Sequence, residues 1–385
     1  MSLMEREELA AWLRLTLTPG VGNTAARHLL RAFGLPQCIF EQSSQALQTC
    51  VSAAQATALL SLPQNLETLI ESTWQWLQET SIGAPVRAIA PLGHPLYPAP
   101  LLDTEDPPLM LYLMGAERYM SPGALTGMHC VAMVGSRNPT PQGNDNARQF
   151  ARSLRTAGLT IVSGLALGID AAAHEGALAE SRDDDRTPAT IAVVGTGLDR
   201  VYPSRHRDLA HRIAARGLLV SEYPLGTPPL AANFPKRNRI ISGLSQGTLV
   251  VEAAPASGSL ITARMASEQG REVFAIPGSI HAIQSRGCHA LIRQGAKLVE
   301  TAQDVLEELQ WPAPASPTPL TAPSVARETT DPLLEIMGFD PIGLDALQAR
   351  SGLDTASLQV QLLELELAGM VGRLPGGMFQ RMGLA

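Results

Sequence analysis

The sequence predicts an α/β protein whose centre is a doubly wound parallel sheet, with a small all-α domain before it and a small, mostly helical domain after it. From residue 131 to about 300, short β-branched runs alternate with helical stretches, as in a parallel sheet covered by helices on both faces. Residues 5–80 show no strand pattern, and a segment rich in Pro, Ala, Ser and Thr precedes residue 331. A length of 385 residues also suits two or three domains.

The central domain is predicted over residues 85–308, and its strands are short apolar runs that end in Gly or a polar residue. The expected strands are Val131–Gly135, Thr160–Ser163, Ile191–Gly195, Leu219–Glu222, Thr248–Glu252, Val273–Ile276 and Lys297–Glu300. Ligands of such sheets bind outside the carboxyl ends of the strands. We therefore expect the binding site in the loops that follow these strands.

The N-terminal domain, residues 4–84, is predicted to consist of short helices and contains a Gly-rich turn at Leu17–Ala26. Two interpretations fit this turn. It resembles a helix-hairpin-helix, whose glycines let N–H groups at a helix N-terminus approach a DNA phosphate. It also fits a plain turn between two packed helices, and a lone Pro-Gly-x-Gly does not decide between them.

After a predicted linker at 309–330, residues 331–385 form the predicted C-terminal domain. Helices are expected near 332–337, 344–350 and 355–368, followed by a two-stranded hairpin, and this order resembles a winged helix. The domain carries seven acidic residues against three arginines. A DNA-reading helix needs basic flanks, so we favour a protein contact over groove binding here.

Composition limits the possible functions. The formal net charge is −7, so any contact with nucleic acid must use a local basic cluster. Four scattered cysteines without CxxC spacing predict neither a zinc site nor a disulfide framework. The chain lacks an apolar run of the roughly 18 residues that a membrane span needs, and we expect a cytoplasmic protein without membrane contact.

The densest basic cluster follows the fourth expected strand and spans Asn233–Ser245, with the sequence NFPKRNRIISGLS. It holds Lys236, one of only two lysines in the chain, next to Phe234, on which a base could stack. Basic charge beside an aromatic ring is typical of a groove that follows a single strand. The alternative is that some of these cations pair with Glu222 or Glu252, and we expect at least one of them to be structural.

Three more loops at the same sheet edge could bind an anion. Gly135-Ser136-Arg137 would let a backbone approach a phosphate that Arg137 clamps, unless Arg137 is only paired at the strand end. Arg205 adds positive charge to a third loop. Ser257-Gly258-Ser259 opens a helix whose free N–H groups suit an anion.

The sequence contains neither the GxGxxG nor the GxxxxGK[ST] pattern, and the segment from Gly247 to Arg264 forms no GxSxG, so we predict no cofactor, no metal and no catalytic residue. Asp170 is expected to cap a helix rather than to act as an acid. His206 has no partner in sequence that would make it a general base.

Five ordered motifs between about Tyr97 and Val299 make the chain similar to the DprA family, also called Smf, of DNA-processing proteins. They are GSR at Gly135–Arg137, SGLALGID at Ser163–Asp170, GTGLD at Gly195–Asp199, FPKRNRII at Phe234–Ile241 and SGSLITA at Ser257–Ala263. Two positions depart from the family's pattern: Ser204 precedes Arg205 where many members have lysine, and His289 stands where Asn is frequent.

The resemblance implies an extended Rossmann-like domain that binds single-stranded DNA, forms a homodimer and hands the strand to the RecA recombinase during natural transformation. It also suggests a sterile-alpha-motif-like or helix-hairpin-helix N-terminal domain and a winged-helix C-terminal domain. The predicted DNA contacts are Gly135, Ser136, Arg137, Gly164, Arg205, Asn233, Phe234, Lys236, Arg237, Asn238, Arg239, Ser257, Gly258 and Ser259.

An enzyme is the alternative, because similar sheets occur in nucleotide phosphoribohydrolases. Those proteins carry PGGxGTxxE, and this chain offers only Gly247-Thr248 and Glu252, without the double glycine. Glu252 would be the candidate acid. A pure protein scaffold would leave the basic cluster at 236–239 unexplained.

Overall fold

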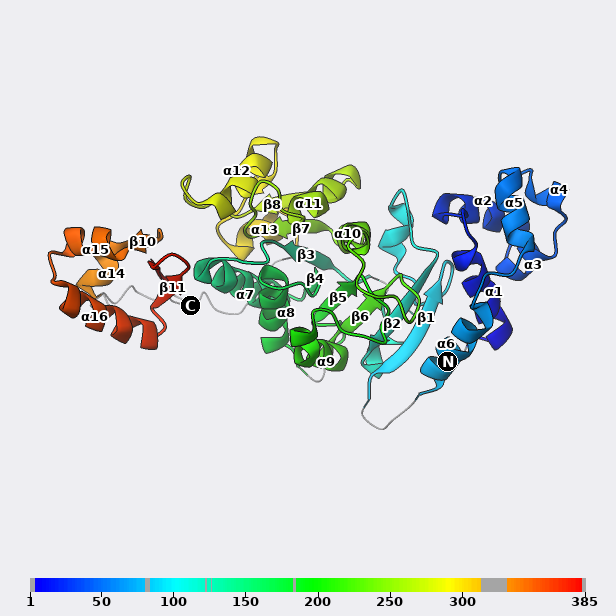
Figure 1. The fold of residues 1–385 in the computed structure, drawn as a ribbon, viewed down its shortest axis with the longest axis horizontal. Helices are drawn as coiled ribbons and strands as arrows, with labels where there is room; N and C mark the ends of the chain where they lie inside the picture. The colour runs from blue at the N-terminus through cyan, green and yellow to red at the C-terminus, as the bar shows by residue number, and fades with distance from the viewer. Residues whose placement is uncertain are drawn as a thin grey trace.

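The computed structural model describes residues 4–79, 84–121, 123–125, 127–182, 185–312 and 331–382. Three parts follow one another along the chain: a helical N-terminal part, a central sheet domain and a C-terminal part (Figure 1). Most of the predicted linker, from 313 to 330, lies outside the described residues.

The central domain is built on a nine-stranded sheet in the order β1-β2-β6-β5-β4-β3-β7-β8-β9. The seven strands predicted from the sequence are all present, with ends shifted by at most two residues. They are β3 Cys130–Val134, β4 Thr160–Ser163, β5 Thr190–Val194, β6 Leu218–Ser221, β7 Gly247–Val250, β8 Glu272–Ala275 and β9 Lys297–Leu298. They pair in parallel, and the chain reverses direction across the sheet between β3 and β7. Ligand sites of doubly wound sheets lie at such a reversal.

Two further strands, which lie outside the predicted alternation of strands and helices, extend the sheet beyond β6. β1 (Val86–Pro91) pairs antiparallel with β2 (Met110–Gly115), and β2 pairs antiparallel with β6. The sheet is therefore mixed at this edge. Since β2 runs against β6, the loop before β2 lies at the same edge as the carboxyl ends of the parallel strands.

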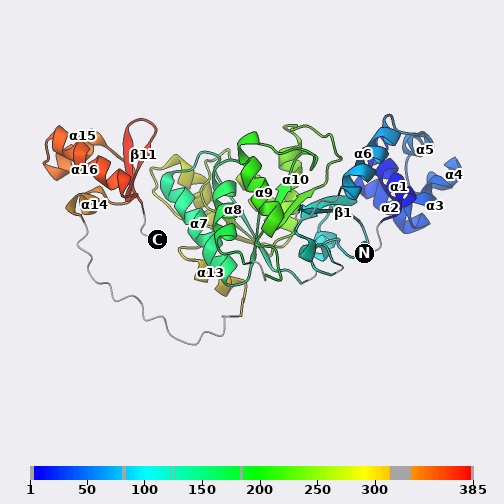
Figure 2. The same cartoon turned by 90° about the horizontal axis from the view of Figure 1, so that it is seen from below.

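Helices cover both faces of the sheet, as predicted (Figures 1 and 2). Apolar side chains of α10, α11 and α12 pack on one face, and those of α7, α8 and α13 pack on the other. The helices are α7 Pro141–Thr156, α8 Ile169–Ala179, α9 Arg207–Arg216, α10 Asn233–Gly243, α11 Ser259–Glu268, α12 Arg286–Arg293 and α13 Ala302–Glu308, with short 3-10 turns η1 Ala99–Asp103, η2 Glu117–Tyr119, η3 Ser204–His206 and η4 Ile283–Ser285.

The N-terminal part is all-helical and packs against the end of the sheet. Its helices are α1 Arg6–Leu17, α2 Asn23–Phe33, α3 Pro36–Phe40, α4 Ser44–Leu47, α5 Ala53–Leu60 and α6 Leu66–Gln78. The Gly-rich turn joins α1 to α2, and the Asn23 amide donates to Glu222 at 3.3 Å. Arg27 donates to the carbonyl oxygen of Glu105 at 2.8 Å. These bonds give the turn a packing role, and DNA contact by it stays a prediction.

The C-terminal part is a winged helix, as predicted. Its elements are α14 Pro332–Met337, β10 Ile342–Gly343, α15 Leu344–Ser351, α16 Thr355–Leu367, β11 Val371–Leu374 and β12 Met378–Arg381. The three strands form a small sheet, and leucines of all three helices share one core. β11 and β12 contact the start of α7, where Gly372 lies so close to Pro141 that an added Cβ would come within 2.8 Å of its ring.

Across the described segments, every helix is too short or too polar to cross a bilayer.

Candidate nucleic-acid interface

A cavity of about 760 Å³ opens at the carboxyl edge of the sheet, where the strand order reverses. Loops after β3, β4, β5 and β7 line it, together with the first turns of α10 and α11. We call it the edge pocket. It brings together most of the loops that were expected to bind an anion.

The loop after β3 fits tightly against the loop after β4. The Ser136 N–H donates to the carbonyl oxygen of Glu252 at 2.7 Å, and the Ser136 carbonyl accepts from Ile169 at 3.1 Å. Gly168 has a φ of +78°, and a Cβ there would come within 2.4 Å of the Ser136 carbonyl oxygen. Glycine is therefore needed where the two loops touch. This packing holds Arg137 at the rim of the pocket.

Arg137 is exposed and makes no ion pair with the described part of the chain. The alternative in which it only pairs at the strand end is therefore not observed. Lys236 and Arg205 are likewise exposed and unpaired among the described residues. Lys236 lies between two pocket-lining residues of α10, and Arg205 lies three residues beyond the pocket-lining Tyr202. Arg137 therefore lines the edge pocket without an ion pair, and two further exposed cations lie within three residues of its lining.

Arg237 differs from its neighbour Lys236 because it is buried, with 5% of the residue exposed. Its Nη1 donates to the carbonyl oxygens of Gly164 and Val193, at the carboxyl ends of β4 and β5. Burial lowers the pKa of Arg237 to about 10, and Asp170 opposes this shift, so the guanidinium stays charged at neutral pH. Its Nε lacks a hydrogen-bond partner among the described atoms.

Arg239 forms ion pairs within the protein instead of facing the edge pocket. Its Nε lies 3.0 Å from Asp106, and its Nη2 pairs with Glu222, which also accepts the bond from Asn23. Arg239 therefore joins the core domain to the loop before β2 and to the N-terminal part. At least one cation of the cluster was expected to be structural, and both Arg239 and Arg237 have contacts of this kind. A DNA contact by either residue stays a prediction.

Two predicted contact residues have backbone partners. The Asn233 amide donates to the Gly195 carbonyl at 3.0 Å and fixes the start of α10 against the end of β5. Gly164 lies against Arg237, since a Cβ there would come within 2.1 Å of the guanidinium. Both residues shape the pocket from behind, whereas Asn238 lines it directly.

The prediction that Asp170 caps a helix is wrong. Gly168 is the N-cap of α8, and the Asp170 Oδ2 accepts from the N–H groups of Gly164 and Ala166, each at 3.2 Å. Asp170 lies inside the first turn, so its carboxylate turns back onto the preceding loop. Burial raises its pKa and Arg237 opposes the rise, which makes Asp170 the internal counter-charge of the buried arginine.

An aromatic pair stands at the mouth of the pocket. The rings of Tyr202 and Phe234 lie 5.5 Å apart with a tilt of 38°, and both line the cavity. Tyr202 is 49% exposed, so one face of the pair is open to a ligand. Phe234 was predicted and Tyr202 was not. The two residues are 32 positions apart, and only the fold places them together.

The far wall of the pocket is the start of α11. Ser257, Gly258 and Ser259 line it, and the two serine hydroxyls lie 2.7 Å apart. A Cβ built on Gly258 would meet no atom within 4 Å, so this turn faces open space. The positive end of the α11 dipole therefore adds to the attraction for an anion.

Glu252, the acid of the enzyme alternative, is engaged under α7. Its two carboxylate oxygens accept from the N–H and the hydroxyl of Thr140, the former at 2.9 Å. Burial raises the pKa of Glu252, and these bonds oppose the rise. A carboxylate held at the start of a helix stabilises that helix.

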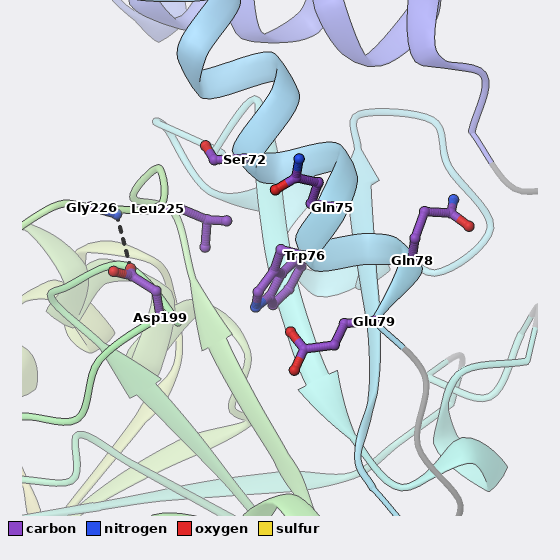
Figure 3. Close-up of a pocket in the computed structure, with 8 residues that line it drawn as sticks. All are labelled: Ser72, Gln75, Trp76, Gln78, Glu79, Asp199, Leu225 and Gly226. Carbon is purple, nitrogen blue, oxygen red and sulfur yellow. Dashed lines mark hydrogen bonds between the residues drawn. The ribbon is translucent and has the colours of Figure 1, made fainter.

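A second hollow, of about 710 Å³, lies between α6 and the loops after β5 and β6 (Figure 3). Figure 3 shows Trp76 near the middle of the view, with the carboxylate of Glu79 below its ring and that of Asp199 to the left. Asp199 accepts from the Gly226 N–H at 2.9 Å, and Glu79 pairs with Arg87. Asp199 also pairs with Arg200 at 2.9 Å, and the residues that line this hollow include no lysine or arginine, in contrast to the edge pocket. Within the described residues, acidic, histidine and cysteine side chains form no cluster suited to a metal ion.

Comparison with known proteins agrees with this geometry. Residues 88–310 match the family model of DNA recombination-mediator protein A, and residues 310–377 match the DprA winged helix domain. Protein Smf of Escherichia coli K12 is 42% identical over 340 residues, which are 86% of this chain and 85% of that protein. DNA processing protein DprA of Streptococcus pneumoniae R6 is 46% identical over 215 residues, which are 56% of this chain and 72% of that protein.

Two solved structures are also similar. The X-ray structure of DprA from Streptococcus pneumoniae has a TM-score of 0.63 and 35% identity, and covers 80% of this chain and 98% of that one. A structure of DprA from Helicobacter pylori, described for its single-stranded DNA binding mode, has a TM-score of 0.50 and 30% identity, and covers 58% and 95%. The chain therefore belongs to the DprA/Smf family of DNA-processing proteins.

Proposed function

We propose that this protein binds single-stranded DNA in the edge pocket and does so without chemistry. The observation that carries the proposal is the convergence of phosphate-binding and base-binding groups on one cavity. Arg137 at the rim supplies positive charge, and the start of α11 adds the positive end of a helix dipole. Tyr202 and Phe234 supply a stacking surface. The solved Helicobacter pylori relative, described as a single-stranded DNA binder, supports the same assignment.

Unpaired bases suit this pocket better than a duplex. A base can stack on the exposed aromatic pair only when it is free of its partner strand, and stacking of this kind tolerates any sequence. The strand's phosphates would contact Arg137 and the start of α11, while Lys236 and Arg205, exposed and within three residues of the pocket lining, add positive charge. The acidic winged helix adds no comparable basic surface.

The family membership supports a wider role. We propose that the protein protects single strands and loads the RecA recombinase onto them during natural transformation, acting as a homodimer in the cytoplasm. The charge pattern is compatible with a loader, because a few phosphate contacts hold the strand firmly yet leave most of it accessible.

Nucleotide hydrolysis with Glu252 as the acid is the weaker candidate. Both oxygens of Glu252 are engaged by Thr140, so the carboxylate would have to leave these bonds to reach a substrate. Its surroundings favour a structural role at the start of α7.

Binding to a poly-thymidine oligonucleotide, followed by fluorescence anisotropy at several salt concentrations, tests the proposal. If about 3–5 phosphates are neutralised, the log–log salt slope should be roughly −2 to −3.5. Arg137→Ala and Lys236→Ala should each weaken binding about ten- to a hundredfold, since a charge-assisted contact contributes roughly 1.5–3 kcal/mol. Each change should also flatten the slope by about 0.7.

Lys297→Ala is the matched control. Lys297 is the other lysine of the chain, it lies on β9, and it pairs with Glu308 at 3.1 Å. Its removal should leave DNA affinity unchanged. A salt-independent affinity, a clear preference for duplex, or an equal loss in all three variants would refute the assignment of the edge pocket.

A further inference from the structure

The outer face of α16 carries large apolar side chains without a partner. Leu358, Leu362 and Leu365 fill the core of the winged helix. On the opposite side, Val360, Leu363 and Leu367 are 57%, 52% and 81% exposed. A surface helix of a small domain normally turns polar residues outward. α16 is instead apolar on two sides, which points to a second packing surface.

The spacing of the outer residues is that of a helix-packing seam. The exposed Ala356, followed by Val360, Leu363 and Leu367, gives steps of four, three and four residues. This is the a/d pattern by which one helix packs against another, with a small residue at one end to admit a close approach. We call these four residues the outer seam.

The described remainder of the chain does not cover the outer seam. In Figures 1 and 2 the wing strand β11 lies between the helices of this domain and α7, so α16 is on the far side from the central sheet. The wing is the part that touches α7, at Gly372 and Pro141. A partner could reach α16 without disturbing this contact.

Charge around the outer seam selects the kind of partner. α16 contains no lysine or arginine, and Glu364 is exposed beside Leu363 without an ion pair among the described residues. Glu366 follows on the wing side, 3.2 Å from Arg373. DNA phosphates would be repelled here. A second copy of α16 would bring more glutamates and no new cation to the contact.

We propose that the outer seam of α16 docks an amphipathic helix from another protein, one whose apolar residues follow the same three-four spacing and are flanked by Lys or Arg. Leucines of that helix would pack on Val360, Leu363 and Leu367, and its cations would meet Glu364. The proposal is independent of the edge pocket. It gives the winged helix a protein-binding role.

Two synthetic helical peptides of about four heptads test the proposal. Both carry leucines at three-four spacing, one with flanking Lys and Arg and the other with flanking Glu. Titrated against the full chain by fluorescence anisotropy, the basic peptide should bind at least about tenfold more tightly. Leu363→Glu and Val360→Glu should each weaken it about tenfold or more, and Glu364→Lys should reduce the preference between the peptides.

Leu62→Glu is the control for unspecific attraction to an acidic protein. Leu62 is a 72% exposed leucine in the N-terminal part, and its replacement adds the same charge. The peptide should bind this variant as it binds the parent.

Equal binding of both peptides, or an equal effect of the Leu62 and Leu363 changes, would overturn the proposal. Self-association of the chain that Leu363→Glu abolishes would assign the seam to a second copy instead. Single-strand affinity of Leu363→Glu should equal that of the parent, which separates this proposal from the edge pocket.

Discussion

α10 and α16 are the two helices in which a sequence search would first look for DNA contacts, and their surfaces carry opposite charge. α10 turns Lys236 outward and buries Arg237, at an edge where several loops converge. α16 follows α15 in a winged helix, the position of a DNA-reading helix, yet it carries leucines on two sides and glutamates between them. The difference teaches that local charge decides which element can meet phosphate. The topology of a motif alone does not.

The largest effect expected from this comparison is on folding stability at α10. Arg237→Leu removes a buried cation and leaves the carbonyl oxygens of Gly164 and Val193 and the carboxylate of Asp170 without their partner. Breaking a buried pair of this kind costs about 3–5 kcal/mol. Lys236→Leu, one residue earlier but exposed, should stay within about 0.5 kcal/mol.

Urea unfolding followed by circular dichroism measures both variants. Similar midpoints for the Arg237 and Lys236 variants would mean that the guanidinium does not hold the ends of β4 and β5 together. The structural role assigned to it would then be wrong.

The next effect concerns the stacking surface. Tyr202→Ala should weaken binding to poly-thymidine by about 1–3 kcal/mol, because one base loses an aromatic face. The salt slope should not change, since no phosphate contact is lost. Tyr202→Phe keeps the ring and should bind as the parent does. A changed slope in the alanine variant, measured by anisotropy titrations across salt concentrations, would contradict a stacking role.

The residues of α10 and Tyr202 show how much of the candidate site can be predicted from the sequence. The basic cluster of α10 is visible in the sequence as consecutive basic residues. Consecutive residues of a helix point about 100° apart, so Lys236 is exposed whereas Arg237 is buried. Arg239 meets Asp106, whose position depends on the antiparallel strand β2. Tyr202 reaches Phe234 only through the path of the loop after β5. Contacts between distant segments cannot be deduced from local patterns.

The fold could be predicted from the sequence more completely than the site. β-branched runs that end in Gly or a polar residue located β3 to β9, because a buried parallel strand is a continuous apolar run. β1 and β2 were missed, although Met110–Gly115 is also a short apolar run. They precede the regular alternation of strand and helix, and their pairing with β6 is antiparallel. The alternation that identified the other strands therefore gave no information about them.

A smaller effect is expected when the acidic domain is removed. Deleting residues 318–385 should leave affinity for single-stranded DNA within about tenfold, or 1.4 kcal/mol, of the parent. The edge pocket lies wholly within the remaining residues. Anisotropy titration of the shortened chain checks this. A larger loss would move the DNA site toward the winged helix and remove the contrast between α10 and α16.

The smallest effect is expected at Glu252, and it separates a DNA clamp from an enzyme. Glu252→Gln keeps the side-chain shape, and the new amide can still accept from the Thr140 N–H and can donate to the Thr140 hydroxyl. Stability should therefore change by no more than about 1 kcal/mol. DNA affinity should stay equal or rise slightly, because one negative charge near the loop after β3 is lost.

Under the hydrolase alternative, the same change would abolish release of free base from a nucleoside monophosphate. Both assays on parent and variant decide the matter: a parent that releases base and a folded variant that does not would establish the enzyme, whereas unchanged DNA binding with no base release from either favours the clamp.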